Sequence, residues 1–273
     1  MKAKIIIAFL LLCPQLFAQG DSERFKASYD RQVRYVGVAG AGVETIIDRW
    51  TAECPDDPDA WAAKFNWCFA KARGSEIVQK EGARYLGAKP VLSLKDSLGA
   101  DVNYFEVSTF VDSLYAGGMR AIDKSISLRP KEFRYRFYKI SALMDYEKES
   151  PDLAAGEINA LIGEYTSGKE GWTLDSAAAD EDIFLQAVGE YCYTLFQTGS
   201  TLSYEYFRGI SERMNKLYPR NTVFIDNLGS YWQVAKKNDR KALKYYKKAL
   251  KIDPEDYAAT RNIRLIERSQ KKK

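Results

Sequence analysis

The spacing of apolar residues along the chain predicts that most of it is helical. From residue 19 onward, apolar side chains recur three or four positions apart, which gathers them on one face of an α-helix. A helix predicted over residues 106–128 ends before Pro130, because the residue that precedes a proline is pushed out of the helical region. We therefore predict an all-α fold, with apolar stripes over residues 25–36, 43–50, 61–72, 107–126, 133–144, 153–165, 183–195 and 202–217.

Residues 91–105 break this helical spacing. Leu92 and Leu94 alternate with polar residues, as do Val102 and Tyr104, and the turn-forming sequence DSLG lies between the two runs. Alternation with a period of two is typical of a strand that has one apolar face. The pattern predicts a small β-hairpin inserted among the helices.

Residues 163–180 have almost no periodicity, and we predict a surface loop there. Trp172 lies in this loop and has two interpretations. It either contacts a partner or folds back onto the helices. The second interpretation is favoured, because an isolated aromatic side chain gains more from burial than from exposure.

The segment 221–254 contains the clearest internal pattern. From Ile225 it reads IDNLGSYWQVAKKNDRKALKYYKKALKIDP, with small, aromatic and proline residues at regular spacings. This segment resembles the tetratricopeptide repeat (TPR), a pair of helices of about 34 residues that stacks on its neighbours. The positions that carry the resemblance are Leu228, Gly229, Trp232, Ala242, Tyr246, Ala249, Leu250 and Pro254.

The resemblance implies a role for each of these positions. Gly229 and Ala242 would let the two helices approach closely. Trp232 and Tyr246 would fill the space between the helices, and the proline would end the second helix. The segment departs from the family because its turn, through residues 236–240, is one residue longer than usual.

Other parts of the chain match the repeat less closely. Residues 118–130 have the spacings of a repeat's second helix, and residues 255–269 are predicted to form a C-terminal cap helix. The family resemblance implies a TPR-like α-solenoid of antiparallel helical hairpins over residues 19–273. In the cap helix, we expect Tyr257, Ile263 and Ile266 to face inward and Arg261, Arg264 and Arg268 to face elsewhere.

The first eighteen residues have the pattern of a secretory signal peptide. Two lysines precede an apolar run over residues 5–12, and the small residue Ala18 follows. This run is too short to span a membrane, which takes about 20 apolar residues. We predict a signal peptide at residues 1–18 and export to the periplasm or beyond. A lipoprotein anchored through Cys13 is less favoured, because Leu12 stands where a small residue is expected.

Together with this signal, three motifs point to one group of proteins. GVAGAGVETIIDRW, PDDPDAWAAKFNW and RPKEFRYRFYKI are similar to sequences of exported TPR proteins of Bacteroidetes-type bacteria, a group without an assigned activity. The resemblance covers nearly the whole exported chain. It implies a helical-repeat architecture but no particular activity.

Cleavage after residue 18 would leave three cysteines, Cys54, Cys68 and Cys192. An odd number does not make a complete disulfide framework. Either Cys54 and Cys68 form one disulfide, or all three are small buried residues, and the second alternative is favoured.

Composition excludes several kinds of site. The chain has no histidine, so His-based triads, His-ligated zinc and a histidine pH switch are ruled out. Gly37, Gly40 and Gly42 follow a helical pattern, which favours a helix–helix turn over a phosphate-binding loop. The acids at residues 180–182 stand where a helix should begin, and this placement suits the helix dipole. We predict no catalytic residue, metal or cofactor.

Charge is distributed unevenly along the chain. Lys and Arg total 41 against 37 Asp and Glu, a net charge of +4. Residues 144–190 have twelve acidic and two basic residues, a net −10, whereas residues 236–273 have fourteen basic and five acidic residues, a net +9. A basic stripe at helical spacing is formed by Arg240, Lys244, Lys247, Lys248 and Lys251.

Three interpretations of the basic stripe stay open. It is an ordinary solvated helix face, a surface that docks an acidic partner, or one side of a head-to-tail self-association with the acidic middle of another copy. Nucleic acid is not expected as a partner of an exported chain.

We expect a non-catalytic protein–protein interaction scaffold of the cell envelope, which binds a peptide or protein in a concave helical groove. The groove would be lined by Asn66, Phe69, Asp226, Ser230 and Gln233. Two alternatives from other classes are a glycan hydrolase that uses carboxylates on a helical scaffold and a carbohydrate-binding protein that uses exposed tryptophans.

Overall fold

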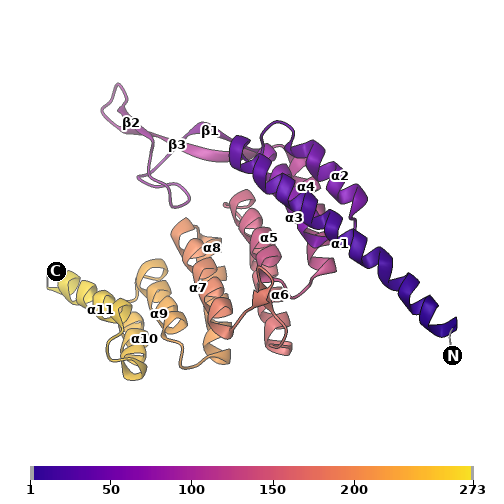
Figure 1. Ribbon diagram of the computed structural model, residues 1–273. Coiled ribbons are helices and arrows are strands. Elements are labelled where there is room, and N and C mark those ends of the chain that lie inside the picture. The colour runs from indigo at the N-terminus through magenta and orange to yellow at the C-terminus, as the bar shows by residue number, and fades with distance from the viewer. Residues whose placement is uncertain (1–2, 272–273) are drawn as a thin grey trace. The chain divides into compact units, whose positions relative to one another are not determined.

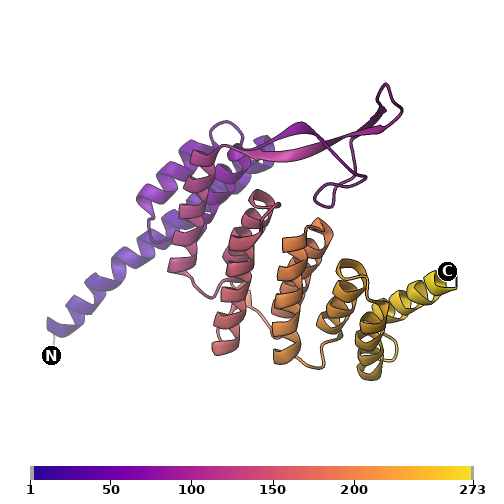
Figure 2. The same ribbon diagram turned by 180° about the vertical axis from the view of Figure 1, so that it is seen from behind.

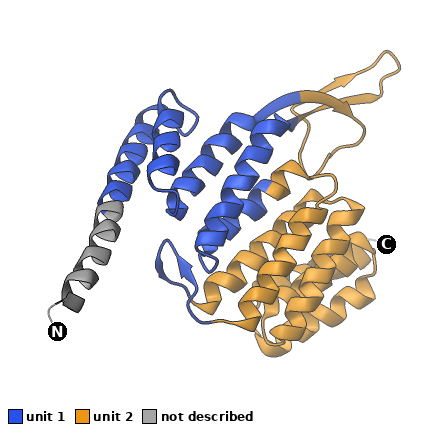
Figure 3. Ribbon diagram, turned by 90° about the vertical axis from the view of Figure 1, so that its right-hand side faces the viewer, with its two compact units in different colours: residues 1–76, 107–142, 170–179 blue, residues 77–106, 143–169, 180–273 orange. Residues whose placement is uncertain are grey.

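A computed structural model describes residues 3–271 of the protein, with side chains from residue 20 onward. The predicted signal peptide and Cys13 precede the first described side chain. The chain forms two compact units (Figure 3). Unit 1 contains residues 1–76, 107–142 and 170–179, and unit 2 contains residues 77–106, 143–169 and 180–273.

The fold is mostly helical with a small antiparallel sheet, as the apolar spacing predicted. The α-helices are α1 (Ala3–Val36), α2 (Val43–Glu53), α3 (Pro58–Ala72), α4 (Asp112–Leu128), α5 (Phe133–Tyr146), α6 (Asp152–Ser167), α7 (Glu181–Thr198), α8 (Thr201–Leu217), α9 (Thr222–Ser230), α10 (Asp239–Ile252) and α11 (Tyr257–Gln270). A π-helical segment, η1 (Tyr231–Ala235), follows α9. The strands are β1 (Arg73–Lys80), β2 (Leu92–Lys95), β3 (Asp101–Phe110), β4 (Thr173–Leu174) and β5 (Ala177–Ala178).

In unit 1, each of the first four helices packs on its neighbour in the chain, and α1 also contacts α3 (Figure 1). The turn between α2 and α3 is fixed by Asp57. Its carboxylate caps α3 by accepting the N–H of Asp59, at 2.9 Å, and it accepts the indole N–H of Trp50, at 2.8 Å. The hydroxyl of Ser22 in α1 donates to the same carboxylate. One acid therefore begins a helix and ties three helices together.

The predicted loop around Trp172 folds back onto unit 1, which confirms the favoured interpretation. Trp172 is buried and its ring stacks on Phe133, with ring centroids 4.6 Å apart. The tight turn between β4 and β5 is held by hydrogen bonds to the buried carboxylate of Glu132. This carboxylate accepts the backbone N–H groups of Asp175, at 2.8 Å, and Ser176, at 3.1 Å.

In unit 2, each helix from α7 to α10 packs on the next one along the chain. Contacts between α6 and α8, α7 and α9, and α9 and α11 link helices two places apart. Figure 1 and Figure 2, taken from opposite sides, both show α7 to α11 following one another in chain order. The segment with the TPR resemblance forms α9, η1 and α10, two helices joined by a short turn.

Directly before the turn that is one residue longer than in the TPR family, the chain forms the π-helical segment η1. The N–H of Lys236 donates to the carbonyl of Tyr231, five residues back, at 3.2 Å. A π-helical turn holds one residue more than an α-helical turn, so the additional residue widens the end of the first helix. Lys237 then takes a positive φ of 49° as the chain turns into α10.

The hairpin predicted at residues 91–105 is confirmed, but the sheet is larger. β2 pairs antiparallel with β3, with Leu92 opposite Tyr104 and Leu94 opposite Val102. β1 adds a third strand on the other side of β3. The expectation that a helix begins at residue 106 was wrong, because β3 continues to Phe110 and α4 begins at Asp112. The residues at this point, VSTFV, are mostly β-branched or aromatic, and such residues favour strands.

The cap helix is present as α11, with one inward residue misassigned. Ile266 is buried and Ile263 partly buried, as expected, but Tyr257 is 78% exposed. The inward positions continue back to Ala259, and Tyr257 lies about 200° around the helix from that residue.

Cys54, Cys68 and Cys192 are free and buried, which confirms the favoured alternative. None of the helices in the described part of the chain has the length and hydropathy that a membrane span requires.

The closest approach between α9 and α10 predicts a measurable cost for a single methyl group. A Cβ added at Gly229 would lie 2.5 Å from a ring carbon of the buried Tyr246. We expect Gly229→Ala to lower the free energy of unfolding by about 1–3 kcal/mol, because the ring has no room to move away. Chemical denaturation followed by circular dichroism measures this.

The matched control is Gly209→Ala in α8, where an added Cβ meets nothing within 4 Å. There alanine should stabilise the helix by about 0.5–1 kcal/mol, since glycine is the poorer helix former. Equal effects at the two positions would contradict the close contact.

Candidate functional site

The predicted groove residues lie in both units. Asn66 and Phe69 are on α3 in unit 1, whereas Asp226 and Ser230 are on α9 and Gln233 is on η1 in unit 2. Nothing in the structure tests whether they bind a partner, so the groove remains a prediction.

In unit 1, both groove residues are in contact with the core. Phe69 is half-buried, and its ring lies 5.8 Å from that of Phe65 and 5.7 Å from that of Phe110. Burial raises the pKa of the Tyr29 hydroxyl on α1, and Asn66, which lies near that hydroxyl, lowers the pKa by less. These side chains hold helices together as well as lining any surface.

In unit 2, Ser230 and Gln233 hold Tyr246. The Tyr246 hydroxyl donates to Oε1 of Gln233 at 2.7 Å and lies 3.2 Å from the Ser230 hydroxyl. Burial raises the pKa of Tyr246 to about 12. The two side chains therefore satisfy a buried phenol at the interface of α9, η1 and α10.

Asp226 forms a buried acid pair with Asp256, the N-cap of α11. Asp226 is 6% exposed and Asp256 9% exposed, and the two carboxyl groups interact electrostatically. Asp256 also accepts the N–H of Ala259 at 2.9 Å. Burial, together with the negative charge of Asp256, raises the pKa of Asp226 to about 8. This shift favours the protonated form of Asp226 at neutral pH, in which its carboxyl group is able to donate to Asp256 between α9 and α11.

Groups able to do chemistry are scarce in the described part of the chain. It contains no cluster of three or more cysteine and acidic residues suited to a metal ion. Burial raises the pKa of the Cys192 thiol to about 12, which keeps it unreactive. All five tryptophans are buried or half-buried, which leaves none as an open platform for sugar stacking.

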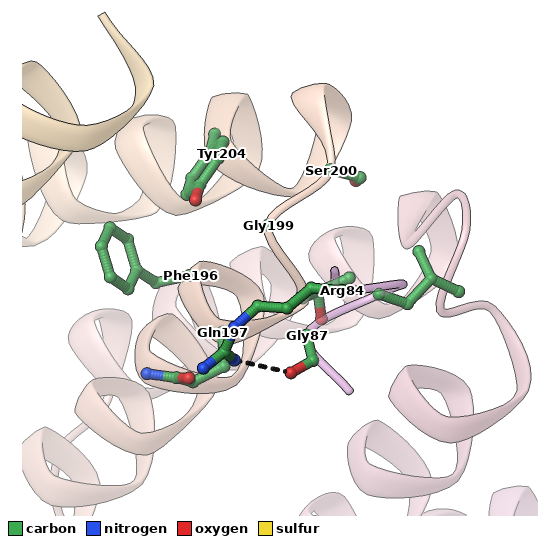
Figure 4. A pocket seen from close by; sticks show the side chains of 9 residues that line it. Arg84, Gly87, Phe196, Gln197, Gly199, Ser200 and Tyr204 are labelled. Carbon is green, nitrogen blue, oxygen red and sulfur yellow. Dashed lines mark hydrogen bonds between the residues drawn. The ribbon is translucent and has the colours of Figure 1, made fainter. Parts of the chain in front are cut away.

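An open pocket of about 430 Å³ lies in unit 2, where the loop between β1 and β2 meets the end of α7 (Figure 4). The turn residues Leu86 and Gly87 both have positive φ, and the Arg84 guanidinium donates to the Gly87 carbonyl at 3.0 Å. A Cβ at Gly87 would lie 2.3 Å from the carbonyl oxygen of Gln197. Only glycine lets this loop reach the helix. Sequence reasoning missed this contact, because nothing local marks its partner.

The part of the three-stranded sheet that lies in unit 2 has one apolar face that is partly exposed. Leu92, Leu94, Val102 and Tyr104 share this face, because each leucine stands opposite one of the other two residues. We call these four residues the apolar sheet face. Leu92 and Leu94 are about half exposed, at 50% and 49%, and Leu98 in the turn is 92% exposed.

The opposite face of the same strands is covered by the chain itself. Phe105 is fully buried, and its ring centroid lies 5.8 Å from that of Tyr85 in the loop between β1 and β2. The amide of Asn103 donates to the carbonyl of Gly82 in the same loop, at 2.9 Å. The chain therefore protects one side of the sheet and leaves its apolar side open.

The basic stripe lies on α10, as the helical spacing predicted. All five side chains are exposed, and the residues buried on the same helix are Ala242, Tyr246 and Ala249. The stripe thus faces away from the core of unit 2. Its members are Arg240, Lys244, Lys247, Lys248 and Lys251.

The acid pair predicts an unusual pH dependence of stability. A carboxyl with a pKa of about 8 in the folded state, against about 4 when unfolded, keeps a proton that the unfolded chain has lost. Its contribution to stability therefore falls as the pH rises from about 4 to about 8. In the variant Asp226→Asn, the side-chain amide is still able to donate a hydrogen bond to Asp256. It has no carboxyl proton to lose as the pH rises. We expect the variant to gain about 1–3 kcal/mol at pH 7.5 and little at pH 4.

Denaturant unfolding across this pH range measures the difference between variant and wild type. Asp56→Asn, at an exposed position of unit 1, serves as the control and should leave the pH profile unchanged. If the difference in the free energy of unfolding between Asp226→Asn and wild type stays constant with pH, the raised pKa of Asp226 in the folded state is contradicted.

Comparison with known proteins adds no family assignment. No protein-family model matches the chain, and no curated protein sequence is significantly similar to it. The role of the protein therefore has to be inferred from its own surfaces.

Proposed function

We propose that the protein is a non-catalytic interaction scaffold of the cell envelope, a TPR-like α-solenoid that binds a protein or peptide partner. Contacts between helices one and two places apart in unit 2 support the solenoid, because stacked helical pairs touch only their neighbours. The close fit of Gly229 against Tyr246 agrees with the small-residue contact that the TPR resemblance implies. Export is supported by the sequence pattern of residues 1–18.

The observation that carries the binding role is the uncovered apolar sheet face. Monomeric proteins rarely leave contiguous apolar patches open, and those that persist often mark a binding site. Burial of a half-exposed leucine against a partner would contribute about 1 kcal/mol. Leu92 and Leu94, with Leu98 beside them in the turn, would thus supply a large part of a moderate affinity.

We place the first contact with a partner on the apolar sheet face rather than in the predicted groove. Ser230 and Gln233 would have to release the buried Tyr246 hydroxyl before binding a ligand. The leucines of the sheet face give up only contacts with water.

Site-specific photocrosslinking in the cells that make the protein tests this role. A photoreactive residue at position 98 should yield a crosslinked adduct of defined mass. The control position is Tyr193, which is 58% exposed on α7 in the same unit and should yield none. Leu92→Ser together with Leu94→Ser should reduce the adduct at position 98 at least about fivefold, a loss of about 1 kcal/mol.

Because about half of each leucine side chain is buried, the double variant should lose about 1–2 kcal/mol in the free energy of unfolding and remain folded, which circular dichroism checks. Equal crosslinking at positions 98 and 193, or an adduct that survives the double substitution, would contradict the proposed surface. Turnover of a substrate by the purified chain would overturn the non-catalytic role.

A further inference from the structure

The basic stripe of α10 is a ridge of uncompensated positive charge. Its five residues lie within about 100° around the helix and extend over about 16 Å along it. All five are exposed, and within the described part of the chain none forms an ion pair. Lys248 has one polar contact, to the Asn215 side chain at 3.4 Å.

Some other cations of unit 2 form ion pairs. Lys236 pairs with Glu205 at 2.9 Å, and Arg208 pairs with Glu205 and with Glu212 at 3.1 and 3.0 Å. Lys169 pairs with Glu181. In each of these cases an acid lies within reach of the cation. The five cations of the basic stripe have no such acid within the described part of the chain.

The neighbouring helix α11 also has unpaired cations. Arg261, Arg264 and Arg268 are exposed and likewise have no acidic partner in the described part of the chain. Two acids near the junction are engaged otherwise, because Asp253 accepts the N–H of Glu255 and Asp256 caps α11. Cations three or four residues apart on a helix repel one another, so this arrangement weakens α10 unless an anion covers it.

We propose that the basic stripe, with the arginines of α11, binds an acidic polypeptide segment of a partner protein. This inference rests on the proposed scaffold role and adds a second surface with defined chemistry. Lysines three and four positions apart repeat about every 5–6 Å along α10, close to the spacing of about 7 Å between alternate side chains of an extended chain. A run of Asp and Glu residues would therefore match the ridge.

Two other anionic partners fit less well. A helix that lies in a lipid bilayer inserts an apolar face, but the apolar residues of α10 are buried in unit 2. In a second copy of this chain, the acids of the middle segment are largely engaged. Asp152 accepts the hydroxyls of Ser150 and Tyr206, Glu181 pairs with Lys169, and Asp180 caps α7. A separate acidic protein is thus the favoured occupant.

Fluorescence anisotropy with a labelled peptide of about twelve glutamates, long enough to cover the stripe, tests the proposal. The reference peptide replaces every glutamate with glutamine. We expect the acidic peptide to bind at about 50 mM salt and to weaken at least tenfold at about 300 mM, where screening is stronger. The glutamine peptide should not bind.

The variant Lys244→Glu, Lys247→Glu, Lys248→Glu should lose at least tenfold in affinity for the acidic peptide. The matched control reverses three exposed lysines elsewhere, Lys71→Glu, Lys89→Glu, Lys124→Glu, and changes the net charge equally. The control should lose less than about threefold, because local rather than total charge determines binding. Circular dichroism of both variants checks that they are folded.

Equal losses in the two variants would overturn the proposal, as would binding of the glutamine peptide. Binding to vesicles rich in anionic lipid without binding to the acidic peptide would also overturn it and assign the stripe to a membrane. Self-association at low salt that the acidic peptide does not inhibit would assign the stripe to a second copy. Photocrosslinking at position 98 tests a different surface. A negative result with the acidic peptide therefore leaves the proposed scaffold role unaffected.

Discussion

The structure depends on close contact between helices that are neighbours in the chain. In unit 2, Gly229 brings α9 against the ring of Tyr246 on α10. In unit 1, Gly118 on α4 does the same against α3, where an added Cβ would lie 3.1 Å from the Cβ of Cys68. At each place the missing side chain lets two apolar stripes meet without a cavity, and dense packing is what such interfaces require. A helix that buries its stripe on its neighbours leaves its opposite face free for other uses.

The sequence allowed these helix pairs to be predicted because the information is local. A stripe with a period of 3.6 residues identifies a helix wherever it folds, and Gly229, Ala242 and Tyr246 lie within one segment of the chain. The same holds for the hairpin of Leu92 and Tyr104 and for the basic stripe. The one-residue excess of the turn was also visible, although its form, a π-helical end to α9, depends on how η1 packs against α8 and α10.

Features that depend on distant partners could not be predicted in this way. Val107 and Phe110 fit a helical stripe as well as a strand, and pairing with β1, about 30 residues earlier in the chain, decides between the two. The polar contacts have the same character. Glu132 bonds backbone groups more than 40 residues away, Asp226 meets Asp256, and Gly87 touches the end of α7. The sequence shows each of these residues but not its partner.

Polar groups that interact within the chain differ from the two surfaces that we propose to bind a partner. Two buried acids are accommodated in different ways: Glu132 accepts backbone N–H groups, and burial beside Asp256 raises the pKa of Asp226. Arg208 on α8 and Lys236 after η1 are paired with glutamates. By contrast, the leucines of the apolar sheet face are about half exposed, and the basic stripe has no acidic partner in the described part of the chain. An open apolar face and a row of repelling cations each cost stability in the isolated chain, so a partner molecule that relieves both is the simplest physical reason for them to persist.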